Sequence, residues 1–130
     1  MKKYLVAVVV ATVSMGIAAA GSLATHGDVR HTPCENATIT AGQEGDVIRG
    51  TPGDDVIRGG PGPDTIRGRG GDDKICGNKS GDTLIGGAGD DKMHGGHAND
   101  SVFGGRGFDR AQGGAGQDTC RAERKTGCDA

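Results

Sequence analysis

Apolar side chains recur with a fixed spacing through most of the chain. From Asp46 to Asp118 an aspartate stands at every ninth position, and an apolar or small residue follows each of them two positions later. These following residues are Ile48, Ile57, Ile66, Ile75, Leu84, Met93, Val102, Ala111 and Cys120. A single apolar position between polar neighbours predicts a short strand with one buried side chain. Repetition at a fixed period predicts a solenoid of stacked repeats.

A glycine-rich segment separates each predicted strand from the next. Glycine stands four positions after each aspartate from Gly50 through Gly113, and the segment is best preserved over residues 86–91, 104–109 and 113–118. Because glycine accepts positive φ and has no Cβ, backbone carbonyls can converge in such a turn. Carbonyl oxygens with one carboxylate per turn suit Ca²⁺, which takes about 6–8 oxygen ligands. The turns are therefore candidate cation sites.

Residues 41–121 follow the pattern G-G-x-G-x-D-x-U-x, in which U is apolar. In this pattern the chain resembles the RTX, or haemolysin-type, calcium-binding repeat family. The resemblance implies an all-β fold, a right-handed parallel β-roll (solenoid) of about nine nonapeptide repeats with two repeats per coil. It also implies several Ca²⁺ ions, held between the turns of successive coils.

Two repeats per coil would distribute the candidate metal ligands over two edges of the roll. The first edge would carry Asp55, Asp73, Asp91 and Asp109, and the second edge Asp46, Asp64, Asp82, Asp100 and Asp118. Turns of the first edge add the backbone of Gly50, Gly53, Gly68, Gly71, Gly86, Gly89, Gly104 and Gly107. The second edge lacks the equivalent glycine at Glu44, Ser80 and Ala98. We therefore expect stronger calcium binding along the first edge.

Composition leaves little material for a conventional hydrophobic core. Hydrophobic residues make up 33% of the chain and aromatic residues 2%, while 27 residues are glycine. Burial of one side chain per repeat does not offset the entropy of ordering the chain, so folding and calcium binding are expected to be linked. The alternative is a disordered, glycine-rich chain with degenerate repeats.

We expect no enzyme, since no arrangement of residues suggests an activated nucleophile. His94 and His97 lack the second ligand pair that a zinc site needs.

The first residues have the pattern of an export signal. Lys2 and Lys3 precede an apolar run over residues 5–20, and small residues follow at candidate cleavage sites. Residues 1–24 are thus predicted to be a secretory signal peptide of a secreted, extracellular protein with no stable membrane insertion. The rest divides into an N-terminal segment and cap (residues 25–43), the RTX-like β-roll (44–124) and a C-terminal cap (125–130).

The four cysteines are disulfide candidates in an exported chain. Cys120 and Cys128 lie close in sequence and can close a small loop over the last repeat, which leaves Cys34 to pair with Cys76. Four free thiols are the alternative.

Charge restricts the partners. A formal net charge of −2 excludes a strongly basic nucleic-acid binder. The predicted outward positions of one sheet include Arg58, Lys74, Lys92, His94 and Arg110. Those of the other are Val47, Thr65, Thr83, Ser101 and Thr119, flanked by Arg49, Arg67, Ile85, Phe103 and Arg121, with Ile85 and Phe103 as a candidate protein contact. We expect a secreted, non-catalytic calcium-binding protein with a structural or cell-envelope role. The alternative is an adhesion module that binds an anionic cell-surface polymer through the cationic sheet.

Overall fold

A computed structural model describes residues 34–128, and within them the regular structure is entirely β. The expected signal peptide lies outside the described residues. The strands are β1 (Ile39–Thr40), β2 (Val47–Arg49), β3 (Val56–Arg58), β4 (Thr65–Gly70), β5 (Lys74–Asn78), β6 (Thr83–Ala88), β7 (Lys92–His97), β8 (Ser101–Arg106), β9 (Arg110–Ala115), β10 (Thr119–Arg121) and β11 (Arg124–Thr126).

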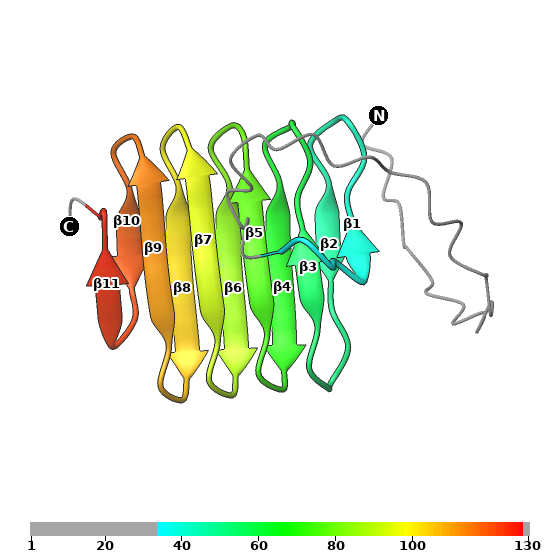
Figure 1. Cartoon of the computed structure of the whole chain (residues 1–130), viewed down its shortest axis with the longest axis vertical. Helices are drawn as coiled ribbons and strands as arrows, with labels where there is room; N and C mark the ends of the chain where they lie inside the picture. The colour runs from blue at the N-terminus through cyan, green and yellow to red at the C-terminus, as the bar shows by residue number, and fades with distance from the viewer. Residues whose placement is uncertain (1–33, 129–130) are drawn as a thin grey trace, which may run out of the picture.

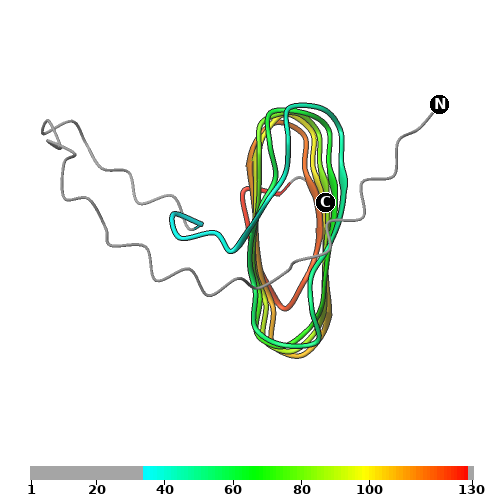
Figure 2. The ribbon, with the colours of Figure 1, turned by 90° about the vertical axis from the view of Figure 1, so that its right-hand side faces the viewer.

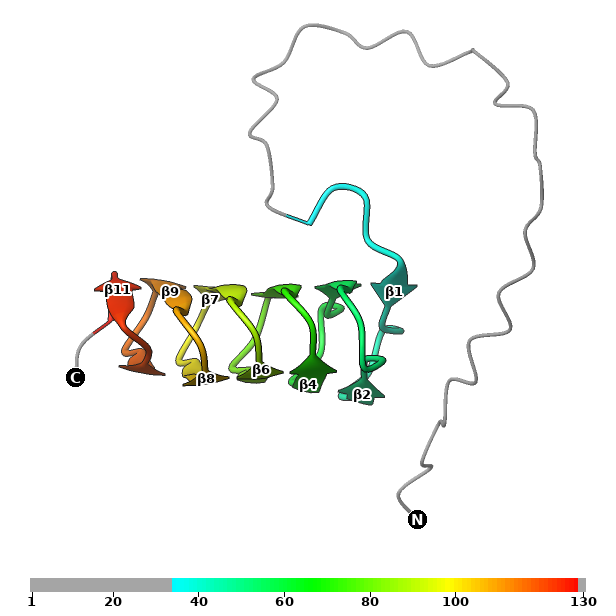
Figure 3. The same ribbon diagram turned by 90° about the horizontal axis from the view of Figure 1, so that it is seen from below.

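The strands form two parallel sheets that the chain visits in turn. Sheet A has the order β1-β3-β5-β7-β9-β11, and sheet B has the order β10-β8-β6-β4-β2. Ile57 lies beside Ile75 in sheet A and Ile66 beside Leu84 in sheet B, so neighbouring strands are two repeats apart. The coils stack into a β-solenoid of about five turns, seen side-on in Figures 1 and 3 and as overlapping flattened rings in Figure 2. The expected all-β parallel roll is confirmed.

The core is a single column of side chains between the two sheets. Each described strand from β1 to β10 contributes one inward residue, and these are Ile39, Ile48, Ile57, Ile66, Ile75, Leu84, Met93, Val102, Ala111 and Cys120. Ile39 lies in register with Ile57, so the segment before the first aspartate continues the repeat. The side chains become smaller toward the C-terminus, and the apolar support of the last coils is correspondingly weaker.

A carboxylate and a disulfide close the C-terminal end of the solenoid. The Glu123 Oε2 atom accepts a 2.9 Å hydrogen bond from the backbone N–H of Asp109. In earlier coils the aspartate of the following coil accepts this bond, so Glu123 replaces the coil that would come next. Cys120 and Cys128 form a disulfide with a Cα–Cα distance of 5.8 Å, which joins β10 to the segment after β11.

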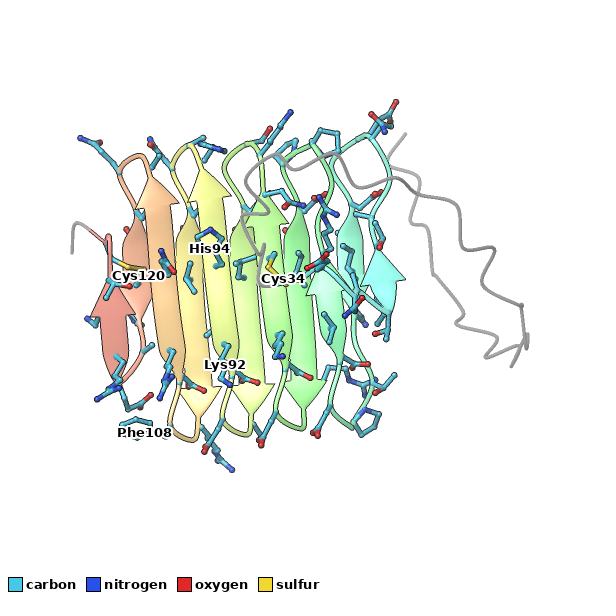
Figure 4. The ribbon with its side chains drawn as sticks, in the orientation of Figure 1. Cys34, Lys92, His94, Phe108 and Cys120 are labelled. Carbon is cyan, nitrogen blue, oxygen red and sulfur yellow. A yellow bond between two sulfur atoms is a disulfide. The ribbon has the colours of Figure 1, made fainter. Side chains whose placement is uncertain are left out.

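A second disulfide attaches the N-terminal segment to the outside of sheet A. Cys34 is bonded to Cys76 of β5, with a Cα–Cα distance of 6.1 Å. The segment that begins at Cys34 therefore lies outside the flattened ring in Figure 2, and Figure 4 labels Cys34. These two cysteine pairs are the ones that the sequence favoured.

Among residues 34–128, no helix is long and apolar enough to span a bilayer.

Candidate metal-binding turns

The repeating aspartates lie inside the turns that connect the two sheets. All of them except the partly exposed Asp46 are buried, and Asp91 and Asp109 have no exposed surface. Residues eighteen positions apart stack, so the first and second edges expected from the sequence are both present. The Oδ1 atom of each stacked aspartate accepts the backbone N–H of the aspartate one coil earlier, for example Asp73 N to Asp91 Oδ1 at 2.9 Å. The carboxylates thus form two continuous ladders along the solenoid.

Two kinds of turn differ in whether the second carboxylate oxygen, Oδ2, accepts a backbone hydrogen bond. It does so in the three N-terminal turns. In each of these, the backbone N–H four positions before the aspartate donates to its Oδ2 atom. The bonds are Gly42 N to Asp46 at 2.7 Å, Thr51 N to Asp55 at 2.6 Å and Gly60 N to Asp64 at 2.7 Å. We call these closed turns. Both carboxylate oxygens of Asp64 are already hydrogen-bonded, since its Oδ1 accepts the Asp46 N–H.

The following turns are open, meaning that the same Oδ2 atom is buried and has no hydrogen-bond partner. This holds for Asp73, Asp82, Asp91, Asp100 and Asp109. In these turns the residue four positions before the aspartate has positive φ, as at Gly87 (128°) and Gly105 (124°). No described residue in the closed turns has positive φ. A buried, charged oxygen without a partner is costly, so a positive group placed beside it would stabilise each open turn.

Two prolines account for the closed turns at Asp55 and Asp64. Thr51 precedes Pro52 and Gly60 precedes Pro61. A residue before proline is restricted largely to extended, negative-φ conformations. These two positions therefore disfavour the positive φ that the open turns adopt, and their N–H groups stay within reach of the carboxylate.

The first glycine of an open turn leaves room for two oxygens from different coils. A Cβ atom on Gly86 would lie 2.7 Å from the carbonyl oxygen of Gly104 and would collide with Asp91 Oδ2. The same crowding of a carboxylate and a carbonyl oxygen recurs at Gly68, Gly77 and Gly95. The equivalent glycines of the closed turns, Gly50 and Gly59, are crowded by a carboxylate and a carbonyl oxygen in the same way, so this feature is common to both kinds of turn.

Burial raises the pKa of the open-turn aspartates. Desolvation raises the pKa of Asp91 to about 6, against a smaller lowering effect of the hydrogen bond from the Asp73 N–H, and the neighbouring carboxylates of Asp73 and Asp109 add to the rise. For the same reasons the pKa is raised to about 6 in Asp73, about 7 in Asp82 and about 6 in Asp100, and it is also raised in Asp109. The ionised turns repel one another unless a cation compensates them.

These oxygens fit a calcium ion better than a zinc ion. Among residues 34–128, no three His, Cys, Asp or Glu side chains converge on a common point. A metal would therefore be held by carboxylate oxygens together with backbone carbonyls, which are ligands that Ca²⁺ accepts. His94 and His97 lie on β7 and form no such cluster with other described residues, although His97 lies near enough to Asp100 to oppose the rise in the pKa of that carboxyl.

Four residues other than glycine adopt the left-handed conformation in the open turns. They are Arg69 (φ 95°), Asn78 (87°), Ser80 (69°) and Ala98 (72°). Ser80 and Ala98 are among the second-edge positions where the sequence lacks the expected glycine. The backbone keeps the open shape there, at a cost of about 1 kcal/mol or more per residue.

We expect Ala98→Gly to stabilise the solenoid by about 0.5–1 kcal/mol, because glycine adopts positive φ without steric cost. Ala115→Gly is the matched control, since Ala115 is also exposed but does not have positive φ. It should lower the free energy of unfolding by about 0.5–1 kcal/mol through backbone entropy. Chemical denaturation in saturating calcium measures both changes, and effects of the same sign would contradict the assignment of strain to Ala98.

A parallel β-solenoid with a stacked aspartate in each turn, buried in all of them except that of Asp46, defines a class of structural repeat protein. The family model of the RTX calcium-binding nonapeptide repeat matches residues 49–80, 77–111 and 98–124. The chain therefore belongs to this family, whose repeats bind calcium and whose members are typically secreted. No curated protein and no solved structure matches the chain.

Proposed function

We propose that this chain is a secreted, non-catalytic protein in which Ca²⁺ bound to the open turns stabilises the solenoid. Its role would be structural, at the cell envelope or in the medium. The observation that carries the proposal is the row of buried Oδ2 atoms without hydrogen-bond partners at Asp73, Asp82, Asp91, Asp100 and Asp109. Secretion is supported by the charged and apolar pattern of residues 1–24 and by two disulfides, which persist in oxidising compartments.

The proposed ligands belong to the open turns. The open-turn carboxylates would hold the ions together with carbonyl oxygens of first-position glycines such as Gly86 and Gly104. When bound, calcium supplies the positive charge that the stacked carboxylates lack. We assign no ion to Asp46, Asp55 or Asp64, because a backbone N–H already occupies the Oδ2 atom of each.

Calcium binding and folding should then be coupled. The core is a single narrow column of side chains, and the open turns bring like charges together in buried positions. Metal that binds only the folded chain adds its binding free energy to the stability of the fold. The closed turns do not need calcium to compensate their carboxylates, because a backbone N–H group already donates to the Oδ2 atom of each. Residual structure without calcium should therefore be confined to the N-terminal coils.

Far-ultraviolet circular dichroism of the oxidised chain tests this proposal. After treatment with a chelator, addition of Ca²⁺ should convert coil to β-structure cooperatively between about 10⁻⁴ and 10⁻³ M, the range of extracellular calcium modules. Mg²⁺ should not replace Ca²⁺, because it requires stricter octahedral geometry. Tryptophan is absent from the chain, so its fluorescence cannot report the transition. Full β-structure in the chelator, or coil at saturating calcium, would exclude a calcium-driven fold.

A further inference from the structure

Sheet A carries an uninterrupted row of basic side chains on its outer face. Lys74, Lys92, Arg110 and Arg124 are direct partners on consecutive strands β5, β7, β9 and β11. All four are exposed, and Figure 4 labels Lys92 on β7. Neighbouring strands lie about 4.8 Å apart, so the four charges form a line parallel to the solenoid axis. We call this line the basic row.

The like charges of the basic row repel one another, and no feature of the described fold requires them at these positions. Like charges on directly paired positions destabilise a sheet, and none of the four has an ion pair with a described residue. Charges that prevent unwanted strand pairing are useful on edge strands. Lys74, Lys92 and Arg110 lie instead on strands that are paired on both sides. A partner of opposite charge would relieve the repulsion.

The same face is hollowed beside the row. A cavity of about 720 Å³ lies at the end of sheet A nearest the second edge. Its lining includes Arg58, Lys79, His94 and His97, and no acidic residue contributes to it. The basic row, with Arg58 and Lys79 of this cavity, makes the outer face of sheet A cationic beside the segment that Cys34 attaches to β5.

Acidic and basic residues are segregated in this fold. The strands of sheet A contain no Asp or Glu, whereas the repeating aspartates lie in the turns, where we propose that calcium binds. Without the predicted signal peptide, which contains Lys2 and Lys3, the formal net charge is −4, so three bound Ca²⁺ ions reverse its sign. The negative charge of calcium-free turns repels a polyanion. Bound calcium compensates this charge, so the basic face then determines the electrostatic attraction of a polyanion.

We infer that the calcium-loaded protein binds a linear acidic polysaccharide along the outer face of sheet A. The inference rests on the proposed function for the calcium loading. Lys and Arg side chains are good donors to sulfate and carboxylate groups. Proteins that bind single-stranded nucleic acid combine a basic groove with aromatic stacking platforms, but the strands of sheet A contain no Phe, Tyr or Trp. The regular line of charges therefore favours a polysaccharide with acidic groups along its length.

The experiment compares two triple variants with equal changes in net charge. Lys74→Glu, Lys92→Glu and Arg110→Glu reverse three of the four charges of the basic row, whereas Arg49→Glu, Arg67→Glu and Arg106→Glu reverse three exposed charges on sheet B. With calcium, the wild type should bind dextran sulfate but not dextran. The row variant should raise the dissociation constant about tenfold or more, and the sheet B variant less than about threefold. Chelation should abolish binding by all three proteins.

Several outcomes would overturn the inference. Equal losses in the two variants would mean that net charge alone determines binding, and equally tight binding of a single-stranded oligonucleotide would remove the preference for a polysaccharide. Circular dichroism of the same samples distinguishes the two proposals. A protein that folds with calcium but does not bind dextran sulfate refutes only the docking surface, whereas one that does not fold with calcium refutes the proposed function as well. If the row variant does not fold, the Lys74→Gln, Lys92→Gln and Arg110→Gln variant replaces it, and Arg49→Gln, Arg67→Gln and Arg106→Gln replace the control on sheet B.

Discussion

Replacing Asp91 by Asn should weaken calcium-dependent folding severely. The substitution leaves an oxygen able to accept the Asp73 N–H but removes the charge and the partnerless oxygen of an open turn. Loss of one charged ligand, worth about 1.5–3 kcal/mol, corresponds to a rise of about tenfold to a hundredfold in the calcium concentration at the folding midpoint. A circular dichroism titration measures the midpoint, and equilibrium dialysis at saturation counts the ions that remain bound.

The matched control is Asp64→Asn, because Asp64 is also buried in a stacked turn but the turn is closed. An amide there faces the Gly60 N–H, so the fold should lose about 1–3 kcal/mol of stability. The number of bound ions should not change, however, since no ion is assigned to this turn. If Asp64→Asn loses bound calcium as Asp91→Asn does, the division into closed and open turns does not determine where metal binds.

The repeat pattern was sufficient to predict the architecture. A spacing of nine residues between apolar positions allows each coil only one inward residue per sheet, and two repeats per coil require partners eighteen residues apart. The observed register of Ile57 with Ile75, and of Ile66 with Leu84, is this arrangement. Every repeat specifies the same strand register through its pattern of apolar and polar positions. A shift of the register by one residue would expose the apolar side chains of all repeats.

The difference between closed and open turns was not predicted, although a signal for it exists. All nine aspartates occupy the same position of the repeat motif, so the motif alone does not distinguish them as ligands. The difference arises from the backbone conformation of the residue four positions before each aspartate, which determines whether the N–H of that residue donates to the Oδ2 atom of the carboxylate. Pro52 and Pro61 disfavour the open conformation in their turns. Glu123 was also missed as the acceptor for the Asp109 N–H, because it lies out of phase with the repeat and only the three-dimensional closure of the last coil brings it there.

The stronger binding expected along the first edge stays a prediction. Partnerless Oδ2 atoms occur on both edges, at Asp73 and Asp91 on the first and at Asp82 and Asp100 on the second. The edges do differ in strain, since Asn78, Ser80 and Ala98 have positive φ on the second edge, whereas Arg69 is the non-glycine residue with positive φ in the described turns of the first. The position of a turn along the solenoid, rather than its edge, separates carboxylates that are already hydrogen-bonded from those that are not.

Acid should partly replace calcium as a stabiliser of the fold. Burial raises the pKa of Asp73, Asp91 and Asp100 to about 6 and that of Asp82 to about 7, from an ordinary value of 3.8. Because the folded chain binds these protons more tightly than the unfolded chain, the free energy of unfolding without calcium must fall as pH rises from about 4 to about 7. We therefore expect β-structure to increase in the presence of a chelator when the pH is lowered from about 7.5 to about 4.5. Circular dichroism across this range measures the change.

Asp82→Asn provides the control for this pH dependence. Removing the carboxyl with the highest of these pKa values should flatten the upper part of the profile, near pH 7, and increase β-structure there without calcium. His94 acts in the opposite sense, since burial lowers its pKa and its protonation in acid disfavours the fold. The carboxyls outnumber this histidine, so the net effect of acid should be stabilising. A calcium-free chain that loses β-structure on acidification would show that the buried carboxylates do not limit its folding, and calcium would then have no charge repulsion to relieve in these turns.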